Sequence, residues 1–423
     1  MKKQRLEKSF KGPNVSFWFT GRSSLVNEKY EIFIREQFDE LKRINYFPHF
    51  RVLAGPDDTK SNLDGQEILI LCANNYLGLA NHPEMKEAAI AAIKKYGAGM
   101  GTGRMIMTYD MQEELDEKLA EFKSADAALV YPTGYTANLG SIWCVMAEGD
   151  TIVSDELNHA SIIDGCRMAR KTNRIIYKHN DMEDLEKKLK ESTKTRETGK
   201  TMIITDAVFS MDGDICPLPE IIELAEKYDA FTFIDEAHAS GVLGKNGRGT
   251  CEHFNVEGKV EVQMGTLSKA LATVGGYIAG SEELRYYLYR RSRPFCFSTG
   301  FLSPGECGAA LKAVEILKRE PERVERLRDN TKYFKKELQD LGFNTGVSQT
   351  PITPVIVGTP EKAQLLSKLL YEKEKIFCGA ISYPVVPKGT DRIRSIVNSH
   401  HTKEQLDYAV GGFERVGKEL KII

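Results

Sequence analysis

The sequence has no excess of charge of one sign and no long apolar run. Its 423 residues carry 58 basic and 60 acidic side chains, so nothing indicates a surface built for nucleic acid or for an anionic membrane. The first residues, MKKQRLEKSFKG, lack the apolar region of a signal peptide. No apolar stretch reaches membrane-spanning length. We therefore expect a cytoplasmic protein with no membrane span and no nucleic-acid partner.

The eight cysteines are scattered, and no two of them form a Cys-x-x-Cys pair. Several fall in apolar segments. This pattern is typical of reduced thiols in a cytosolic enzyme and argues against a disulfide framework or a metal site. Internal repeats and low-complexity tracts are also missing. The length is sufficient for two domains around a large core.

Strands and helices alternate through most of the chain, which predicts an α/β fold. Alternation of this kind is typical of a mainly parallel sheet covered by helices on both faces. The expected strands of this sheet cover residues 127–131, 151–154, 174–177, 202–205, 231–234, 262–264 and 277–279.

After about residue 302 the pattern changes to that of a smaller α+β domain. Two amphipathic helices are expected near 304–318 and 322–341, and a last helix near 403–418. Short strands are expected at 353–357, 376–381 and 393–397, with a further helix at 30–44 and a strand at 68–71. We expect the following division: 1–27 as an N-terminal extension, 28–70 as a segment that packs with the small domain, 71–302 as the large domain and 303–423 as the small one.

An acid stands at the end of the most strongly apolar strand, in the stretch FTFIDEAH. Asp235 follows residues 231–234, and a carboxylate buried there needs a cation or hydrogen-bond donors. In an open parallel sheet, ligands bind outside the carboxyl ends of the strands. Asp235 is therefore placed to face a positively charged nitrogen of a ligand.

A lysine follows in the stretch GTLSKALA. Lys269 has apolar neighbours and no adjacent counter-charge, and a poorly hydrated lysine loses its proton readily and attacks carbonyls. An acid for a pyridinium nitrogen, a lysine for an aldehyde and a Ser/Thr/Gly turn for a phosphate together indicate a pyridoxal phosphate site. Taken singly, each residue is better explained without a ligand, Asp235 as a capped strand end and Lys269 as a snorkelling surface lysine. Together, in this order and spacing, they favour the cofactor site.

Seven motifs resemble the α-oxoamine synthase family of fold-type I pyridoxal phosphate enzymes, across roughly residues 65–420. They are CANNYLGLANHPE, SDELNHASIIDG, FSMDGD, DEAHASGVLGKNGRG, GTLSKAL, RRSRPFCFS and YPVVPKGTDRIR. The likeness is greatest to the glycine C-acetyltransferase (2-amino-3-ketobutyrate CoA ligase) branch. The resemblance implies a large domain with a seven-stranded sheet, and an acyltransferase that condenses an amino acid, here glycine, with an acyl-CoA.

The same resemblance implies roles for individual residues. Catalysis is expected of Lys269, Asp235, His238 and His159, and substrate binding of Asn75, His159 and Arg394. The expected cofactor contacts are Gly134, Tyr135, His159, Ser210, Asp235, His238, Thr266 and Lys269, together with Ser298 and Thr299 from a partner subunit. The implied assembly is therefore a homodimer with a shared site. Arg392 shares a strand face with Arg394 and is expected to be an ordinary surface arginine.

One stretch, GAGMGTGRMIMTYDMQEE, departs from the family. Met107 and Thr108 replace a Gly-Thr pair, and Gln112 replaces a histidine. Outside this stretch, Thr299 replaces an asparagine. Met105, Met107 and Met111 form either a pliant wall for the acyl group or plain core packing. Sibling activities with a longer acyl-CoA or another amino acid, of the 8-amino-7-oxononanoate synthase or serine palmitoyltransferase type, therefore stay open. More remote alternatives are an aminotransferase on the same fold and a catalytically silent subunit.

Overall fold

The computed structural model describes residues 27–43, 51–195, 199–299 and 301–423. Their contacts form two compact units, one up to Val52 and one from Leu53 to the C-terminus. In the first unit, helix α1 (Glu28–Arg43) has none of its residues buried. An ion pair between Arg43 and Glu40, 2.6 Å long, links neighbouring turns of this helix.

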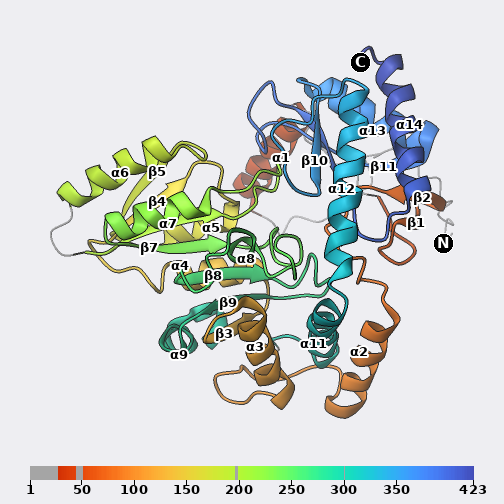
Figure 1. Cartoon of the computed structure of the whole chain (residues 1–423). Coiled ribbons are helices and arrows are strands. Elements are labelled where there is room, and N and C mark those ends of the chain that lie inside the picture. Colours follow the sequence, from red (N-terminus) through yellow and green to blue (C-terminus); the bar gives the residue numbers. More distant parts are fainter. Residues whose placement is uncertain (1–26, 44–50, 196–198, 300) are drawn as a thin grey trace. The chain divides into compact units, whose positions relative to one another are not determined.

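The second unit contains the predicted seven-stranded sheet, in the order β3-β9-β8-β7-β6-β4-β5 (Figure 1). All pairs are parallel except the two that β9 makes, which are antiparallel. The strands are β3 (Ala127–Tyr131), β4 (Thr151–Asp155), β5 (Asn173–Tyr177), β6 (Thr201–Asp206), β7 (Ala230–Asp235), β8 (Val262–Thr266) and β9 (Gly276–Gly280). Each predicted strand is found within one or two residues, and the expected mainly parallel α/β fold is confirmed.

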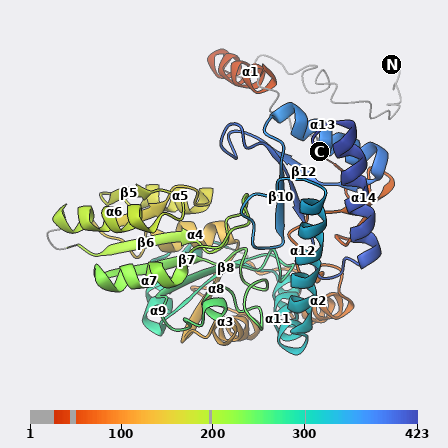
Figure 2. The same ribbon diagram turned by 45° about the horizontal axis from the view of Figure 1, so that its top comes forward.

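Alternate side chains of these strands enter two separate cores, one on each face of the sheet. On β7, for example, Ile234 belongs to one core and Phe233 to the other, as the two-residue period of a strand requires. Helices α3 (Asp110–Lys123), α6 (Met182–Thr195) and α7 (Leu218–Lys227) contribute to the first core, and α4 (Gly134–Ile142), α5 (Ala160–Met168) and α9 (Glu282–Arg291) to the second. Figure 2 gives the arrangement of sheet and helices from another side.

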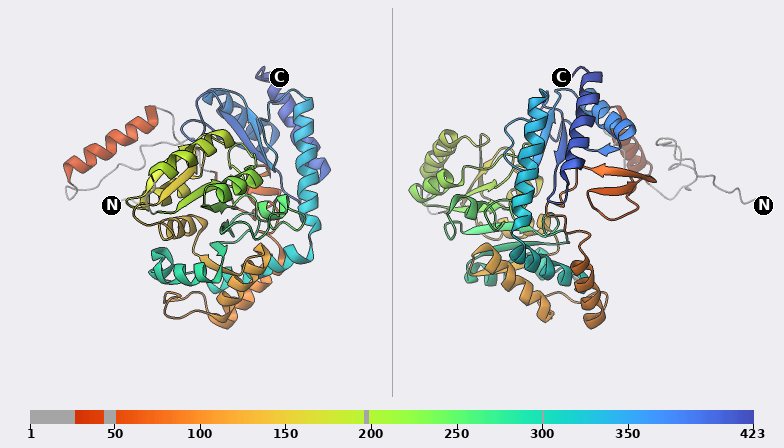
Figure 3. Two further views of the ribbon diagram at one scale, coloured as in Figure 1. Left: turned by 60° about the vertical axis from the view of Figure 1, so that its left-hand side comes forward. Right: turned by 45° about the vertical axis from the view of Figure 1, so that its right-hand side comes forward.

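The C-terminal part forms the smaller domain around a three-stranded antiparallel sheet, β10-β13-β12. Its core joins β10 (Ile352–Ile356) and β13 (Arg392–Ile396) to the helices α12 (Glu322–Asp340), α13 (Pro360–Glu374) and α14 (Lys403–Glu419). Figure 3 shows α12 and α14 running along this domain. Helix α11 (Pro304–Arg319), in contrast, packs on α2 (Pro83–Tyr96) and α3 in the first core of the large domain.

The expected strand at 376–381 is two strands that belong to different sheets. β11 (Ile376–Phe377) pairs with β2 (Gln66–Ile70), which also pairs with β1 (Lys60–Leu63), whereas β12 (Gly379–Ile381) pairs with β13. The C-terminal part thus shares a sheet with the segment that follows Leu53. The boundaries expected at residues 27, 70 and 302 stay a prediction.

Two short helices complete the described chain, α8 (Thr250–Phe254) and α10 (Arg293–Cys296). All eight cysteines are free thiols. Among the helices of the described residues, none is both long and apolar enough to cross a membrane.

Candidate active site

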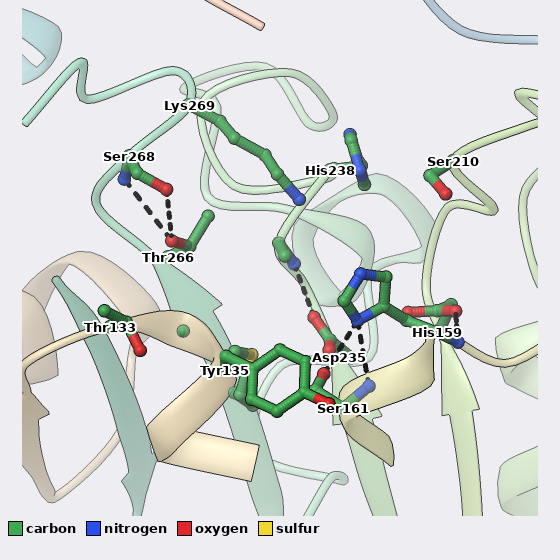
Figure 4. Close-up of a pocket in the computed structure, with 14 residues that line it drawn as sticks. Thr133, Tyr135, His159, Ser161, Ser210, Asp235, His238, Thr266, Ser268 and Lys269 are labelled. Carbon is green, nitrogen blue, oxygen red and sulfur yellow. Dashed lines mark hydrogen bonds between the residues drawn. The ribbon is translucent and has the colours of Figure 1, made fainter. Parts of the chain in front are cut away.

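A cavity of about 260 Å³ opens where β3, β4, β6, β7 and β8 end. Parallel strands present their carboxyl ends at one edge of a sheet, so residues far apart in sequence meet there. Eight of the predicted residues line the cavity: Gly134, Tyr135, His159, Ser210, Asp235, His238, Thr266 and Lys269. Figure 4 shows Lys269 reaching toward Asp235 and His238, with Thr266 and Ser268 on one side and Ser210 on the other.

Asp235 is buried at the end of β7, with both carboxylate oxygens held by neutral donors. One oxygen accepts a hydrogen bond from the backbone N–H of Ala237 at 2.9 Å, and the other from the Asn138 amide at 2.6 Å. These donors fix the carboxylate without neutralising it. A positively charged ring nitrogen in the cavity would therefore find a fixed counter-charge.

Lys269 also lines the cavity, and its surroundings favour the neutral amine over the charged form. Loss of hydration lowers the pKa of Lys269 to about 8, against the opposing effect of Asp235 and Asp206. A lysine with this pKa is partly unprotonated near neutral pH and can attack an aldehyde. The side chain is half-buried, and the role of Lys269 as the amine that holds the cofactor stays a prediction.

His159 both caps a helix and lines the cavity. As the N-cap of α5, its Nδ1 accepts a hydrogen bond from the Ser161 backbone N–H at 3.2 Å and lies 2.7 Å from the Ser161 hydroxyl. Its own backbone N–H donates to Asp206 at 2.8 Å. Burial lowers the pKa of His159. His159 therefore caps α5 and at the same time lines the cavity.

The N-terminus of α4 forms one wall of the cavity, and its backbone amides are available to an anion. Thr133 caps the helix by accepting a hydrogen bond from the Thr136 N–H at 3.0 Å, while the amides of Gly134 and Tyr135 donate to no described residue. A Cβ on Gly134 would lie 3.1 Å from the Thr266 side chain, so only glycine leaves this space open. Two free amides and the hydroxyls of Thr266 and Ser268, 2.9 Å apart, fit a phosphate group.

Arg394 on β13 approaches the cavity from the small domain. Its Nε donates to the backbone carbonyl of Ser210 at 2.6 Å, and its Nη2 lies 3.4 Å from the Asn74 side-chain oxygen. Burial lowers the pKa of this guanidinium. The remaining guanidinium donors are available for a substrate carboxylate, which suits the planar fork of arginine.

The expectation that Arg392 is a surface residue is wrong. Its side chain is 2 % exposed, and Nη1 donates to Asp212 at 2.6 Å and to the Met211 carbonyl at 3.0 Å. A buried guanidinium needs such partners. Arg392 thus fixes the turn that follows Ser210, directly below the cavity.

Asn75 does not line the cavity. Its amide nitrogen donates to the Asp57 carbonyl at 3.1 Å, and its oxygen accepts from the Ala80 N–H, so the side chain organises a turn. The preceding residue, Asn74, is the one that contacts Arg394. Because Asn74 and Asn75 are adjacent in the motif CANNYLGLANHPE, the sequence does not show which of the two contacts Arg394.

Ser298 and Thr299 also lie outside the cavity of their own chain, half-buried and exposed respectively.

The methionines of the stretch that departs from the family divide into two groups: Met111 is buried in the first core, whereas Met105 and Met107 are 37 % and 62 % exposed. Gln112 is buried and donates to the Leu302 carbonyl at 3.1 Å. Core packing therefore explains Met111 and Gln112 but not the other two methionines.

Several residues of the site had not been expected. The cavity is also lined by Thr133, Ser161, Asp206, Ala237, Met264 and Ser268, and Asn138 and Tyr76 bond to residues that line it. Asp206 lines the cavity beside Asp235, and its position after the apolar run of β6 is the same signal that pointed to Asp235. The Tyr76 hydroxyl lies 2.8 Å from Nδ1 of His238. Asn138, inside α4, had no distinguishing sequence signal.

The fold and the cavity together define a transferase of the fold-type I class that uses pyridoxal phosphate. The model of the family described as aminotransferase class I and II matches residues 66–413. The chain is 54 % identical to an 8-amino-7-oxononanoate synthase of Thermoanaerobacter pseudethanolicus over 392 residues, which is 92 % of this chain and 98 % of that protein. It is 51 % identical to the enzyme of that name from Symbiobacterium thermophilum over 393 residues, 92 % and 99 % of the two chains.

A solved structure of serine palmitoyltransferase with pyridoxal phosphate has a TM-score of 0.87 to this chain, at 29 % identity, and the match covers 95 % of this chain and all of the other. The chain belongs to the aminotransferase class I and II family, and within it to the α-oxoamine synthases, which are acyltransferases dependent on pyridoxal phosphate. The sequence was expected to belong to the glycine C-acetyltransferase branch, but neither of these relatives is named as a glycine C-acetyltransferase. They support the alternative, 8-amino-7-oxononanoate synthase.

Proposed function

We propose that this enzyme makes 8-amino-7-oxononanoate from an amino acid and an acyl thioester. The observation that carries the proposal is the 54 % identity, over 98 % of its length, to a protein of that name. The proposal replaces glycine and acetyl-CoA as the expected substrates.

The structure of this product identifies the two substrates. Its last two carbons, a methyl group and the carbon that bears the amine, are alanine without its carboxyl group. The other seven carbons, from the ketone to the terminal carboxylate, form a heptanedioyl group. The reaction is then alanine plus heptanedioyl-CoA, giving the amino ketone, free CoA and CO2, with a carbon–carbon bond formed where the thioester bond breaks.

Pyridoxal phosphate, when bound, forms an imine with amines and accepts electrons from the α-carbon of an amino acid. We assign the residues of the cavity to this cofactor as follows. Lys269 is the amine that holds the cofactor and the base that moves the α-proton. Asp235 faces the ring nitrogen, His238 the ring oxygen and His159 the ring face.

The remaining groups bind the charged ends. The amides of Gly134 and Tyr135, with Thr266 and Ser268, bind the phosphate, and Arg394 binds the amino-acid carboxylate. Ser210 supports Arg394 through its backbone carbonyl. Asn75 was expected to contact the substrate, and from its hydrogen bonds we assign that role to Asn74 instead.

A panel of substrates tests the reaction. Alanine, glycine and serine are each combined with heptanedioyl-CoA, acetyl-CoA and palmitoyl-CoA, and free thiol and product mass are measured. Alanine with heptanedioyl-CoA is expected to give the largest kcat/KM, by about tenfold or more over any other pair, and a product that lacks the alanine carboxyl. The Lys269→Ala variant is the blank. Preference for glycine and acetyl-CoA with the carboxylate retained would contradict the proposal, and so would keto-acid-dependent amino transfer without thiol release.

We also propose that the working enzyme is a homodimer in which Ser298 and Thr299 complete the phosphate site of the partner. The support is that both residues lie outside the cavity of their own chain, although they follow a motif shared with the family. Co-expression of Lys269→Ala subunits with Ser298→Asp subunits tests this arrangement. Mixed dimers would contain one intact site, so roughly a quarter of wild-type activity should return on mixing. Two inactive variants that stay inactive together would refute the shared site.

A further inference from the structure

Tyr76 makes a buried hydrogen bond to the histidine that we assign to the cofactor ring. Its hydroxyl lies 2.8 Å from Nδ1 of His238, although the two residues are 162 positions apart in the chain. Tyr76 is fully buried and His238 is 7 % exposed. Their rings meet edge to face at an interplanar angle of 76°. The partner of Nδ1 of His238 is therefore fixed.

The direction of this hydrogen bond follows from the charges around it. A neutral imidazole carries one proton on one of its two nitrogens, and a phenol both donates and accepts. Burial, together with the positive charges of Lys269 and Arg394, lowers the pKa of His238 well below its usual value, so the ring is neutral. Burial raises the pKa of Tyr76 to about 12, so the phenol keeps its proton.

The geometry gives the direction of this bond. The hydrogen of a buried phenol needs an acceptor, and Nδ1 of His238, 2.8 Å away, is the acceptor that the structure places beside the Tyr76 hydroxyl. Arg394, whose charge opposes the rise in the pKa of Tyr76, offers no acceptor because a guanidinium can only donate. With Nδ1 acting as acceptor, the single proton of the imidazole resides on Nε2.

We propose that Tyr76 is a positioning residue that holds His238 as the Nε2–H tautomer, so that the histidine donates a hydrogen bond to the anionic ring oxygen of the cofactor. Because Tyr76 occupies Nδ1 and His238 lines the cavity, Nε2–H is the polar group that this histidine has left for a ligand. The inference rests on the proposed assignment of His238 to the ring oxygen. It adds Tyr76 to the groups that determine how strongly the ring is held.

The tautomer can be read directly by NMR in the wild-type enzyme. Protein labelled with ¹⁵N-histidine and loaded with cofactor gives two-bond nitrogen–proton couplings that distinguish Nε2–H from Nδ1–H, and the His238 signals are assigned from their loss in His238→Gln. The wild type is expected to show Nε2–H, and Tyr76→Phe a shift toward Nδ1–H. A wild-type enzyme with its proton on Nδ1 overturns the proposal without need of any variant.

Cofactor affinity provides the second measurement. Loss of an oriented hydrogen bond in Tyr76→Phe should raise the dissociation constant of pyridoxal phosphate by about three- to tenfold. Tyr277→Phe is the matched control, because this buried tyrosine bonds to Ser240 at 2.9 Å and not to a cavity residue. The control should change neither the tautomer of His238 nor the dissociation constant.

The double variant separates this inference from the assignment on which it rests. If Tyr76 acts through His238, the combination of Tyr76→Phe with His238→Gln should weaken cofactor binding no more than His238→Gln alone. Additive losses overturn the positioning role of Tyr76 and leave the assignment of His238 intact. Normal cofactor binding in His238→Gln overturns the assignment itself, and the inference with it.

Discussion

Asp206 and Asp235 stand directly opposite each other, at the ends of the parallel strands β6 and β7. Both are buried, at 6 % and 3 % exposure, and like charges at this spacing resist ionising together. Burial, with the charge of Asp235, raises the pKa of Asp206 well above its usual value. We therefore treat Asp206 as a neutral acid that accepts a hydrogen bond from the His159 backbone, and Asp235 as the charged partner for the cofactor.

The first prediction compares the two corresponding amide substitutions. Asp206→Asn replaces a neutral acid by a neutral amide that can still accept from His159, so kcat/KM should stay within about threefold of wild type. Asp235→Asn removes the charge that faces the ring nitrogen and should lower kcat/KM on the order of a hundredfold or more, with the fold retained. Steady-state kinetics and circular dichroism measure both. Equal losses in the two variants would show that the roles have been divided wrongly.

The second prediction concerns the proton of Lys269. In cofactor-free enzyme its pKa is about 8 because its hydration is lost, and only the neutral amine reacts with amine reagents. Modification of Lys269, followed by peptide mass spectrometry, should rise in rate between about pH 7 and pH 9 and then level off. Lys190, whose pKa is raised by Glu186, should react only at higher pH. With cofactor bound, borohydride should attach the cofactor to Lys269, and Lys269→Ala should show neither labelling nor turnover.

The third prediction is a pH-dependent contribution of His179 to stability. This imidazole lies between Asp155 at 3.1 Å and Asp214 at 2.8 Å. Although partial burial disfavours the charged form, the hydrogen bonds that the imidazole donates to these carboxylates raise the pKa of His179 to about 10. Since the folded pKa exceeds the unfolded one, the stabilisation is full below about pH 6.5 and is lost as the pH rises through about 10.

His179→Asn should therefore lower the free energy of unfolding by about 2 kcal/mol at pH 6 and by clearly less at pH 10. Urea titrations of the cofactor-loaded protein at several pH values measure the difference. His253→Asn is the control, because burial lowers the pKa of His253 and its effect should not decline with rising pH. A constant cost of His179→Asn across this range would mean that the histidine is not charged in the folded protein.

The fourth prediction tests the correction made for Arg392. Arg392→Ala removes a buried guanidinium, leaves the half-buried Asp212 without its partner and should destabilise the fold by about 2 kcal/mol or more. It should also raise KM for the amino acid, because the turn that it holds carries Ser210, whose carbonyl anchors Arg394. Arg415→Ala is the matched control: its pair with Glu374 has the same 2.6 Å length but a 57 % exposed arginine, so it should cost below about 1 kcal/mol.

The type and the approximate bounds of most elements follow from the sequence, because each depends on local pattern. Alternating apolar runs give the strands of the large sheet, and the position of Asp235 after one of them gives the edge where a ligand binds. The same reasoning applies to Asp206, which ends β6 as Asp235 ends β7.

Other features of the site depend on contacts across the chain and had no local signal. Arg392 is read as exposed from its own neighbours, and its partners Asp212 and the Met211 carbonyl, 180 and 181 positions away, account for its burial. The bond from Tyr76 to His238 and the contact between Asn74 and Arg394 arise in the same way. The break between β11 and β12 arises because the two strands pair with different sheets, which no periodicity within six residues can reveal.

The cavity walls come from segments between Thr133 and Lys269, and the Ser210 segment is tied to β13 of the small domain through Arg394 and Arg392. Pyridoxal phosphate bound there would contact parts of the chain that separate on denaturation. Binding of the cofactor and folding of the protein are therefore thermodynamically linked. At a hundredfold excess over its dissociation constant, such a ligand adds about 2.7 kcal/mol to the unfolding free energy. Binding of the cofactor is therefore expected to protect this polypeptide against heat and proteases, quite apart from the reaction that it catalyses.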